Sequence, residues 1–244
     1  MKNNRLAQTL SLIVLLASVH SISAQIKFLP YIDIGKHNAS EGIFVKNAFR
    51  SSYQYKKYIV ESGVQFDLVS NNPNLLTGLD LIGSKEFLIR DMPITIKGFF
   101  MMNRFSDIMY ETNWGARIET KKFENFIFEL GTNNKTYTIN SSARAKYNIK
   151  KSTSKHYENF TLIYMVAGYL KPHQNPWNIG LSITNVDFYN INQSTNPVFN
   201  LKMVCNMKSN ITLYMDTWYK QAGIFNINAN YFGYFFRGGI QWEI

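Results

Sequence analysis

The residues with the clearest catalytic chemistry are a serine, a histidine and a glutamate spaced two positions apart. Ser154, His156 and Glu158 would project from one face if this segment were extended. A nucleophile, a base and a carboxylate that orients the base are the groups that ester cleavage requires. Neighbours at i and i+2 on a strand rarely have triad geometry, and the segment is rich in serine and lysine. A polar strand end therefore competes with catalysis, and we assign no catalytic residue.

Other chemical signatures are missing from the sequence. It contains no nucleophile elbow, phosphate-binding loop or zinc motif. Of the histidines beyond the N-terminal segment, His37, His156 and His173, the first and the last fall in predicted connections at opposite ends of the strands, so they cannot meet. We therefore expect neither a metal site nor a cofactor.

The elements that position these residues are predicted by a two-residue alternation of polar and apolar side chains, which is typical of strands with two unlike faces. Along 110–121, for example, Tyr110, Trp114 and Ile118 share one face while Glu111 and Arg117 share the other. No stretch of comparable quality has a helical period. Twelve such segments are predicted near 26–34, 43–55, 57–69, 75–90, 92–105, 109–121, 123–132, 157–170, 176–187, 196–206, 209–220 and 233–244.

The connections between these segments alternate between long and tight. Longer polar connections are predicted around 35–42, 70–74, 106–108, 132–156, 190–195 and 221–232, with tight turns between them. Short periplasmic turns and longer outer loops are typical of outer-membrane barrels. A secreted sandwich would also alternate, but soluble strands usually run about 5–6 residues, whereas a tilted strand that crosses a bilayer needs about 9–11. We therefore predict a closed antiparallel transmembrane β-barrel of about twelve strands.

Charged residues of both signs lie on the polar faces of these strands. A packed soluble core would not accept them, whereas a twelve-stranded barrel has room for a wet or plugged lumen. They could pair with one another and narrow the barrel, or line a pore and set its ion preference; we favour pairing. The residues predicted to line the lumen are Lys46, Arg50, Asp67, Glu111, Arg117, Glu119, Arg237 and Glu243.

The last strand carries a family resemblance. Its apolar face holds Tyr234, Phe236, Ile240, Trp242 and Ile244, and the sequence ends on that face. This pattern resembles the C-terminal strand of bacterial outer-membrane β-barrel proteins, although family members most often end in phenylalanine. The resemblance implies recognition by the barrel-assembly machinery and contact with outer-membrane lipids. Ser154, His156 and Glu158 in turn look like the polar groups of outer-membrane phospholipases and lipid A deacylases.

Export is predicted from the N-terminal residues. Lys2 and Arg5 precede a mostly apolar run that ends at Ala24, so we expect residues 1–24 to be a signal peptide and 25–244 the barrel domain. The strongly apolar run is too short for a comfortable membrane anchor. The single cysteine, Cys205, excludes an intramolecular disulfide framework.

The net charge of +10 does not favour nucleic-acid binding, because basic residues are spread through the chain. The one basic cluster, 144–155, is interpreted as a solvated loop or as a contact for anionic head groups or sugars. The apolar loop 221–234 either folds into the barrel mouth or binds an envelope protein. Three functions remain open: a narrow channel or structural surface protein, a lipid or lipid A acyl-ester hydrolase, and a partner-binding subunit of an envelope complex.

Overall fold

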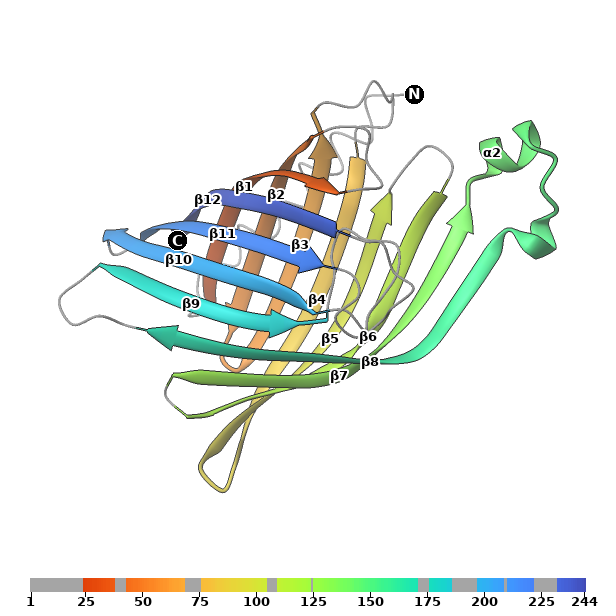
Figure 1. The fold of residues 1–244 in the computed structure, drawn as a ribbon. Coiled ribbons are helices and arrows are strands. Elements are labelled where there is room, and N and C mark those ends of the chain that lie inside the picture. The colour runs from red at the N-terminus through yellow and green to blue at the C-terminus, as the bar shows by residue number, and fades with distance from the viewer. Residues whose placement is uncertain are drawn as a thin grey trace.

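The described residues fold into one closed antiparallel barrel of twelve strands (Figure 1). The computed structural model describes residues 24–37, 43–68, 76–104, 109–123, 125–170, 176–185, 197–208, 210–221 and 232–244. The strands are β1 (Ala24–His37), β2 (Phe44–Tyr55), β3 (Tyr58–Asp67), β4 (Leu76–Ile89), β5 (Met92–Arg104), β6 (Met109–Phe123), β7 (Phe126–Ile139), β8 (Lys155–Leu170), β9 (Trp177–Thr184), β10 (Val198–Lys208), β11 (Ile211–Gln221) and β12 (Phe232–Glu243). Each strand pairs with its neighbours in sequence.

The barrel closes where β1 pairs with β12. Lys27 lies opposite Glu243 and His37 opposite Gly233 along this seam. Backbone hydrogen bonds between Ile26 and Ile244 extend it, at 2.9 and 3.2 Å. Closure leaves the sheet without a free edge, which is the condition for placing a sheet in hydrocarbon.

The twelve predicted segments correspond one to one with the twelve strands, but the predicted loop 132–156 is too long. β7 continues to Ile139 and β8 begins at Lys155. The register of β7 against β8 shifts between Asn133 and Lys135, and the C-terminal half of β7 still pairs with both β6 and β8. Backbone pairing on both sides therefore keeps the chain extended where its polar composition had suggested a loop.

A short helical connection joins β7 to β8. It contains α2 (Ser141–Lys146) and the 3-10 helix η1 (Lys151–Thr153). In Figure 1 this connection projects at the end of the barrel away from the C-terminus. No helix within the described ranges has the length and apolar character to cross a membrane.

Tight turns lie at the opposite end of the barrel from α2. Arg90 and Asp91 join β4 to β5 with φ angles of 47° and 64°. Positive φ at both central residues is what a two-residue hairpin requires to match the twist of its strands. Lys56, between β2 and β3, also has a positive φ, of 53°.

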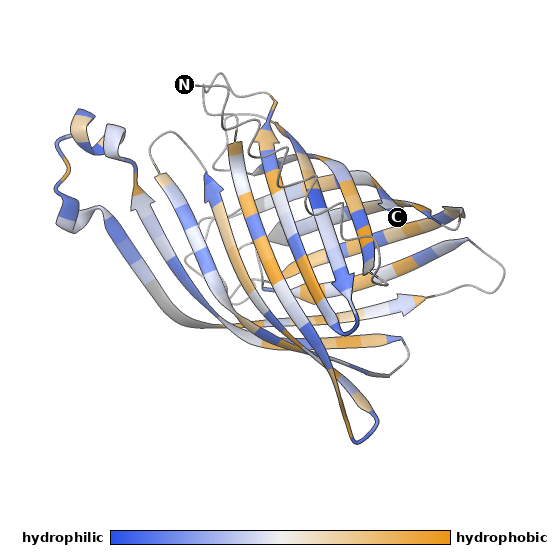
Figure 2. Ribbon diagram, turned by 180° about the vertical axis from the view of Figure 1, so that it is seen from behind, coloured by the Kyte–Doolittle hydropathy of each residue, from blue (hydrophilic) through white to orange (hydrophobic). Residues whose placement is uncertain are grey.

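Side chains alternate between the two surfaces of the wall, and Figure 2 shows the matching alternation of hydropathy along the strands. Large apolar side chains such as Ile118, Leu130 and Leu181 are more than half exposed on the outside. Buried side chains are mostly polar, and Asp33 and Glu111 are fully buried. An apolar exterior around a polar interior is the reverse of a soluble protein and matches a barrel surrounded by lipid.

Candidate functional site

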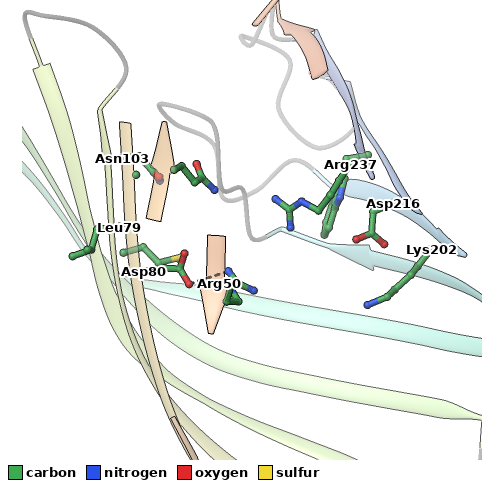
Figure 3. Close-up of a pocket in the computed structure, with 11 residues that line it drawn as sticks. Arg50, Leu79, Asp80, Asn103, Lys202, Asp216 and Arg237 are labelled. Atoms are coloured by element: carbon green, nitrogen blue, oxygen red, sulfur yellow. Dashed lines mark ion pairs between the residues drawn. The ribbon is translucent and has the colours of Figure 1, made fainter. Parts of the chain in front are cut away.

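A cavity of about 200 Å³ lies inside the barrel between opposite parts of the wall. Figure 3 shows Arg50 and Asp80 on one side of this cavity and Lys202, Asp216 and Arg237 on the other. Its remaining lining residues are Gln65, Gly78, Leu79, Met101, Asn103 and Trp218. The lining thus comes from β2 to β5 and from β10 to β12.

The first wall of the cavity is built on an ion pair that spans a glycine. Arg50, Gly63 and Asp80 lie side by side on β2, β3 and β4. Arg50 Nη2 lies 2.9 Å from Asp80 Oδ2. A Cβ on Gly63 would lie 2.3 Å from Asp80 Oδ1. The missing side chain at Gly63 therefore allows charges from two non-adjacent strands to meet.

The second wall is fixed by Arg237, which a buried carboxylate holds in place. Its Nε and Nη2 donate to the two oxygens of Asp33 at 2.8 and 3.0 Å. Its guanidinium also lies 4.1 Å from the centre of the Tyr31 ring. A bidentate pair with a fully buried carboxylate gives Arg237 one fixed orientation.

The charged residues of the second wall belong to a row that runs across the strands and alternates in sign. Each member lies directly opposite the next on a neighbouring strand. From β10 through β12 to β1 and β3 the row is Lys202, Asp216, Arg237, Asp33, Lys46 and Asp67. Opposite charges on facing strands attract, and like charges there would repel. The alternation therefore stabilises this register of the strands around the closure.

A second network fills the lumen on the side of β5 to β7. Lys97 pairs with both Glu119 and Glu129, the latter at 2.9 Å. Arg117 pairs with Glu129 at 2.8 Å and lies 4.5 Å from the centre of the Phe99 ring. Phe99, Met101 and Ile163 form a small buried apolar cluster, so the lumen is narrowed by apolar side chains as well as ion pairs.

All eight residues predicted to line the lumen lie on the inner face of their strands, alternating with outward-facing neighbours. Lys46 lies opposite Asp33 and Asp67. Glu111 is fully buried and accepts a hydrogen bond from the Asn113 side chain. Ion pairs already described hold Arg50, Arg117, Glu119 and Arg237, and Glu243 pairs with Lys27 at 2.6 Å. Their roles in a pore stay predictions.

Sequence reasoning missed many of the partners of these charges. The partners it did not name are Lys27, Asp33, Asp80, Lys97, Glu129, Lys202 and Asp216. Each of these residues points inward between two neighbours that point outward, as Asp33 does between Ile32 and Ile34. That signal was present, but apolar residues on both faces of 75–90 and 92–105 obscured it for Asp80 and Lys97.

Two of the three candidate residues for ester cleavage, Ser154 and His156, have described side chains. Ser154 follows η1 in a helical backbone conformation, and its hydroxyl donates to the Lys151 carbonyl at 2.7 Å. His156 instead stacks on Tyr137, with ring centres 6.1 Å apart. Because Ser154 is not extended, the two side chains do not share the predicted strand face. The side chain of Glu158 lies outside the described residues.

The apolar face predicted for the last strand lies on the outside of the barrel. Phe236, Ile240, Trp242 and Ile244 are each about half exposed or more. In the basic cluster, Lys150, Lys151 and Lys155 are exposed. Most of the predicted loop 221–234 and the predicted signal peptide lie outside the described residues, so both hypotheses stay untested.

We compared the chain with known protein families, curated proteins and solved structures. No protein-family model matches the chain, and no curated protein matches it. Among solved structures it is similar to the KdgM porin, with a TM-score of 0.51 and 12% identity over 88% of this chain and 98% of that one. An outer membrane channel from Pseudomonas putida F1 gives a TM-score of 0.53 and 10% identity over 91% and 96%.

The fold is that of a porin-like outer-membrane β-barrel. Both similarities extend over nearly the whole of each chain, so the porin-like fold includes the full set of strands and not a fragment of the barrel. At these identities the comparison establishes the fold alone, and the chemistry of the lumen has to be argued from the residues of this chain.

Proposed function

We propose that this chain forms a narrow channel through the bacterial outer membrane. The observation that carries the proposal is the cavity between facing charged walls, inside a barrel whose outer surface is apolar. An apolar exterior suits lipid, and a charged interior keeps water. A buried charge-lined space of this kind is where a channel selects among ions and solutes.

The expected pore is narrow because side chains already occupy much of the lumen. Ion pairs from β5 to β7 and the apolar cluster at Phe99 fill one side. A cavity borders this filled region, and it is lined by Arg50 and Arg237 as well as by Met101 of the apolar cluster. We therefore expect passage of small solutes and exclusion of oligomeric ones.

Planar bilayers containing the purified protein test this function. We expect small, discrete conductance steps, because each barrel contributes one narrow pathway. A barrel that migrates faster in detergent gels before boiling than after it serves as the folding control. Folded protein that produces no steps would overturn the channel and favour a purely structural surface barrel.

The proposal also includes how the chain is exported and which lipids surround it. We propose that residues 1–24 are removed on export, that the barrel-assembly machinery inserts the chain, and that outer-membrane lipids surround it. N-terminal sequencing of protein from the envelope checks the first step. A mature chain beginning near Gln25 is expected, and retention of residues 1–24 in the envelope would contradict it.

A further inference from the structure

We propose that the cavity between the Arg50–Asp80 pair and Lys202–Asp216 is a solute-binding site for small zwitterions that carry both an ammonium and a carboxylate group, such as short α-amino acids. This inference rests on the proposed channel function and names the solute class that the site takes. It follows from which charges in the cavity are already neutralised and which are not.

Two of the cavity's three cations have close carboxylate partners. Arg237 makes a bidentate pair with Asp33, and Arg50 pairs with Asp80. Lys202 and Asp216 face each other in the strand register. Within the described part of the chain, neither of them makes an ion pair. These two neighbouring charges of the row attract each other across the strands without a direct ion pair, so both are available to a solute that carries two opposite charges.

Asp216 is buried but incompletely satisfied. It is 5% exposed, and its Oδ1 has no hydrogen-bond partner among the described residues. Arg50 Nε and Asn103 Nδ2 are buried donors in the same cavity that also lack partners within the described ranges. Buried polar atoms are normally satisfied by protein, water or a ligand. The cavity thus offers an acceptor on one wall and donors on the other.

The arrangement matches a solute with two opposite charges. The ammonium group would lie against Asp216, and the carboxylate against Lys202 and the unpaired Arg50 Nε. A solute with only one charge would have to desolvate beside a group of its own sign, since Lys202 and Asp216 are neighbours. The positive and negative groups therefore favour a zwitterion over an anion or a cation of equal size.

The size of the cavity limits the solute. Its volume is about 200 Å³. A free amino acid of a few heavy atoms matches this volume, whereas a peptide or an oligosaccharide is larger than the space between the two walls.

Solute flux into proteoliposomes tests the assignment with size-matched probes. Alanine is the zwitterion, lactate the anion, isopropylamine the cation and glycerol the neutral solute. We expect alanine to enter about five- to tenfold faster than lactate or isopropylamine, the scale of about one unfavourable charge contact. The influx of glycerol gives the rate that solute size alone sets. At low concentration we expect alanine to enter faster than glycerol, because alanine binds to the site.

Two charge-removing variants test the site itself. Asp216→Asn and Lys202→Met should each reduce alanine influx to about the rate of glycerol. Their ion preferences should shift in opposite directions, toward anions for Asp216→Asn and toward cations for Lys202→Met, as measured by reversal potential. Lys57→Met, at an exposed turn residue away from the cavity, is the matched control and should change neither rate nor potential.

The outcomes separate this inference from the channel function. Folded protein with no conductance and no flux of any probe would overturn both. Conductance with equal influx of alanine, lactate and isopropylamine would overturn the zwitterion site and leave the channel. A shift of the reversal potential in the same direction for Asp216→Asn and Lys202→Met would also overturn the zwitterion site alone.

Discussion

Gly63 shows how a single small residue permits an interaction between strands that are not neighbours. It lies between Arg50 and Asp80 in the register, and any Cβ there would approach Asp80 Oδ1. Its contribution is the space that it leaves. Asp33 contributes by charge instead, because its fully buried carboxylate neutralises and orients Arg237.

We expect Gly63→Ala to destabilise the barrel by about 1 kcal/mol, because the new methyl group displaces Asp80 from Arg50. The measurement is urea unfolding in lipid vesicles. Gly83→Ala is the control: no atom lies within 4 Å of its Cβ position, so it should be neutral or stabilising by up to about 1 kcal/mol. Equal effects of the two substitutions would contradict the role given to Gly63.

We expect Asp33→Ala to cost about 3–5 kcal/mol, because it leaves the Arg237 guanidinium buried without its partner. Adding Arg237→Met should recover much of that loss, since the uncompensated charge is then gone. The double-mutant cycle, measured by the same unfolding assay, gives the coupling between the two residues. Additive losses would show that the pair contributes no coupling.

At the scale of elements, strand pairs and their turns divide the barrel into two ends. Two-residue turns such as Arg90–Asp91 lie at one end, and the connection with α2 and η1 lies at the other (Figure 1). Short turns face the periplasm in outer-membrane barrels. The exposed basic residues around Lys150 and Lys151 would then lie outside the cell.

Trypsin added to intact cells should therefore cleave the chain between β7 and β8. Lys150 and Lys151 are exposed there, in a short connection held at both ends by strands. Lys56 and Lys57, in the turn at the opposite end, should be cut only after the outer membrane is opened. Mass spectrometry of the fragments identifies the sites. Cleavage at Lys57 in intact cells with Lys151 protected would reverse the orientation.

At the scale of the whole molecule, the outer surface of the barrel wall requires apolar side chains and the inner surface accepts polar ones. Leu181 is 60% exposed on the outside, near the middle of β9. Its neighbour Ser182 faces the lumen, where its hydroxyl lies 3.4 Å from the side-chain oxygen of Asn200. A charge should be costly at the first position and tolerated at the second, because only one of them faces lipid.

We expect Leu181→Arg to cost about 2–4 kcal/mol, the range for arginine on the lipid face at the bilayer midplane. Ser182→Arg, the matched control, should cost much less because the lumen is hydrated. Unfolding in vesicles and heat-modifiable migration measure both variants. A larger loss for Ser182→Arg than for Leu181→Arg would contradict the assignment of the two surfaces.

The sequence by itself indicated the class of fold, a count of about twelve strands and, where the alternation is clear, the face of the strand on which a charge lies. These features follow from local information, because alternation and segment length depend only on neighbouring residues. Residues 133–139 of β7 were the main exception: their polar side chains suggested a loop, and pairing with β6 and β8 keeps them extended.

Only the tertiary structure decided which charges meet. Asp33 and Arg237 are 204 positions apart and become partners because the barrel closes between β1 and β12. Arg50 reaches Asp80 because the register places Gly63 between them. Register and closure are properties of the whole sheet, so alternation along one strand cannot specify them. For the same reason, no single segment showed that Lys202 and Asp216 would face Arg50 across a cavity.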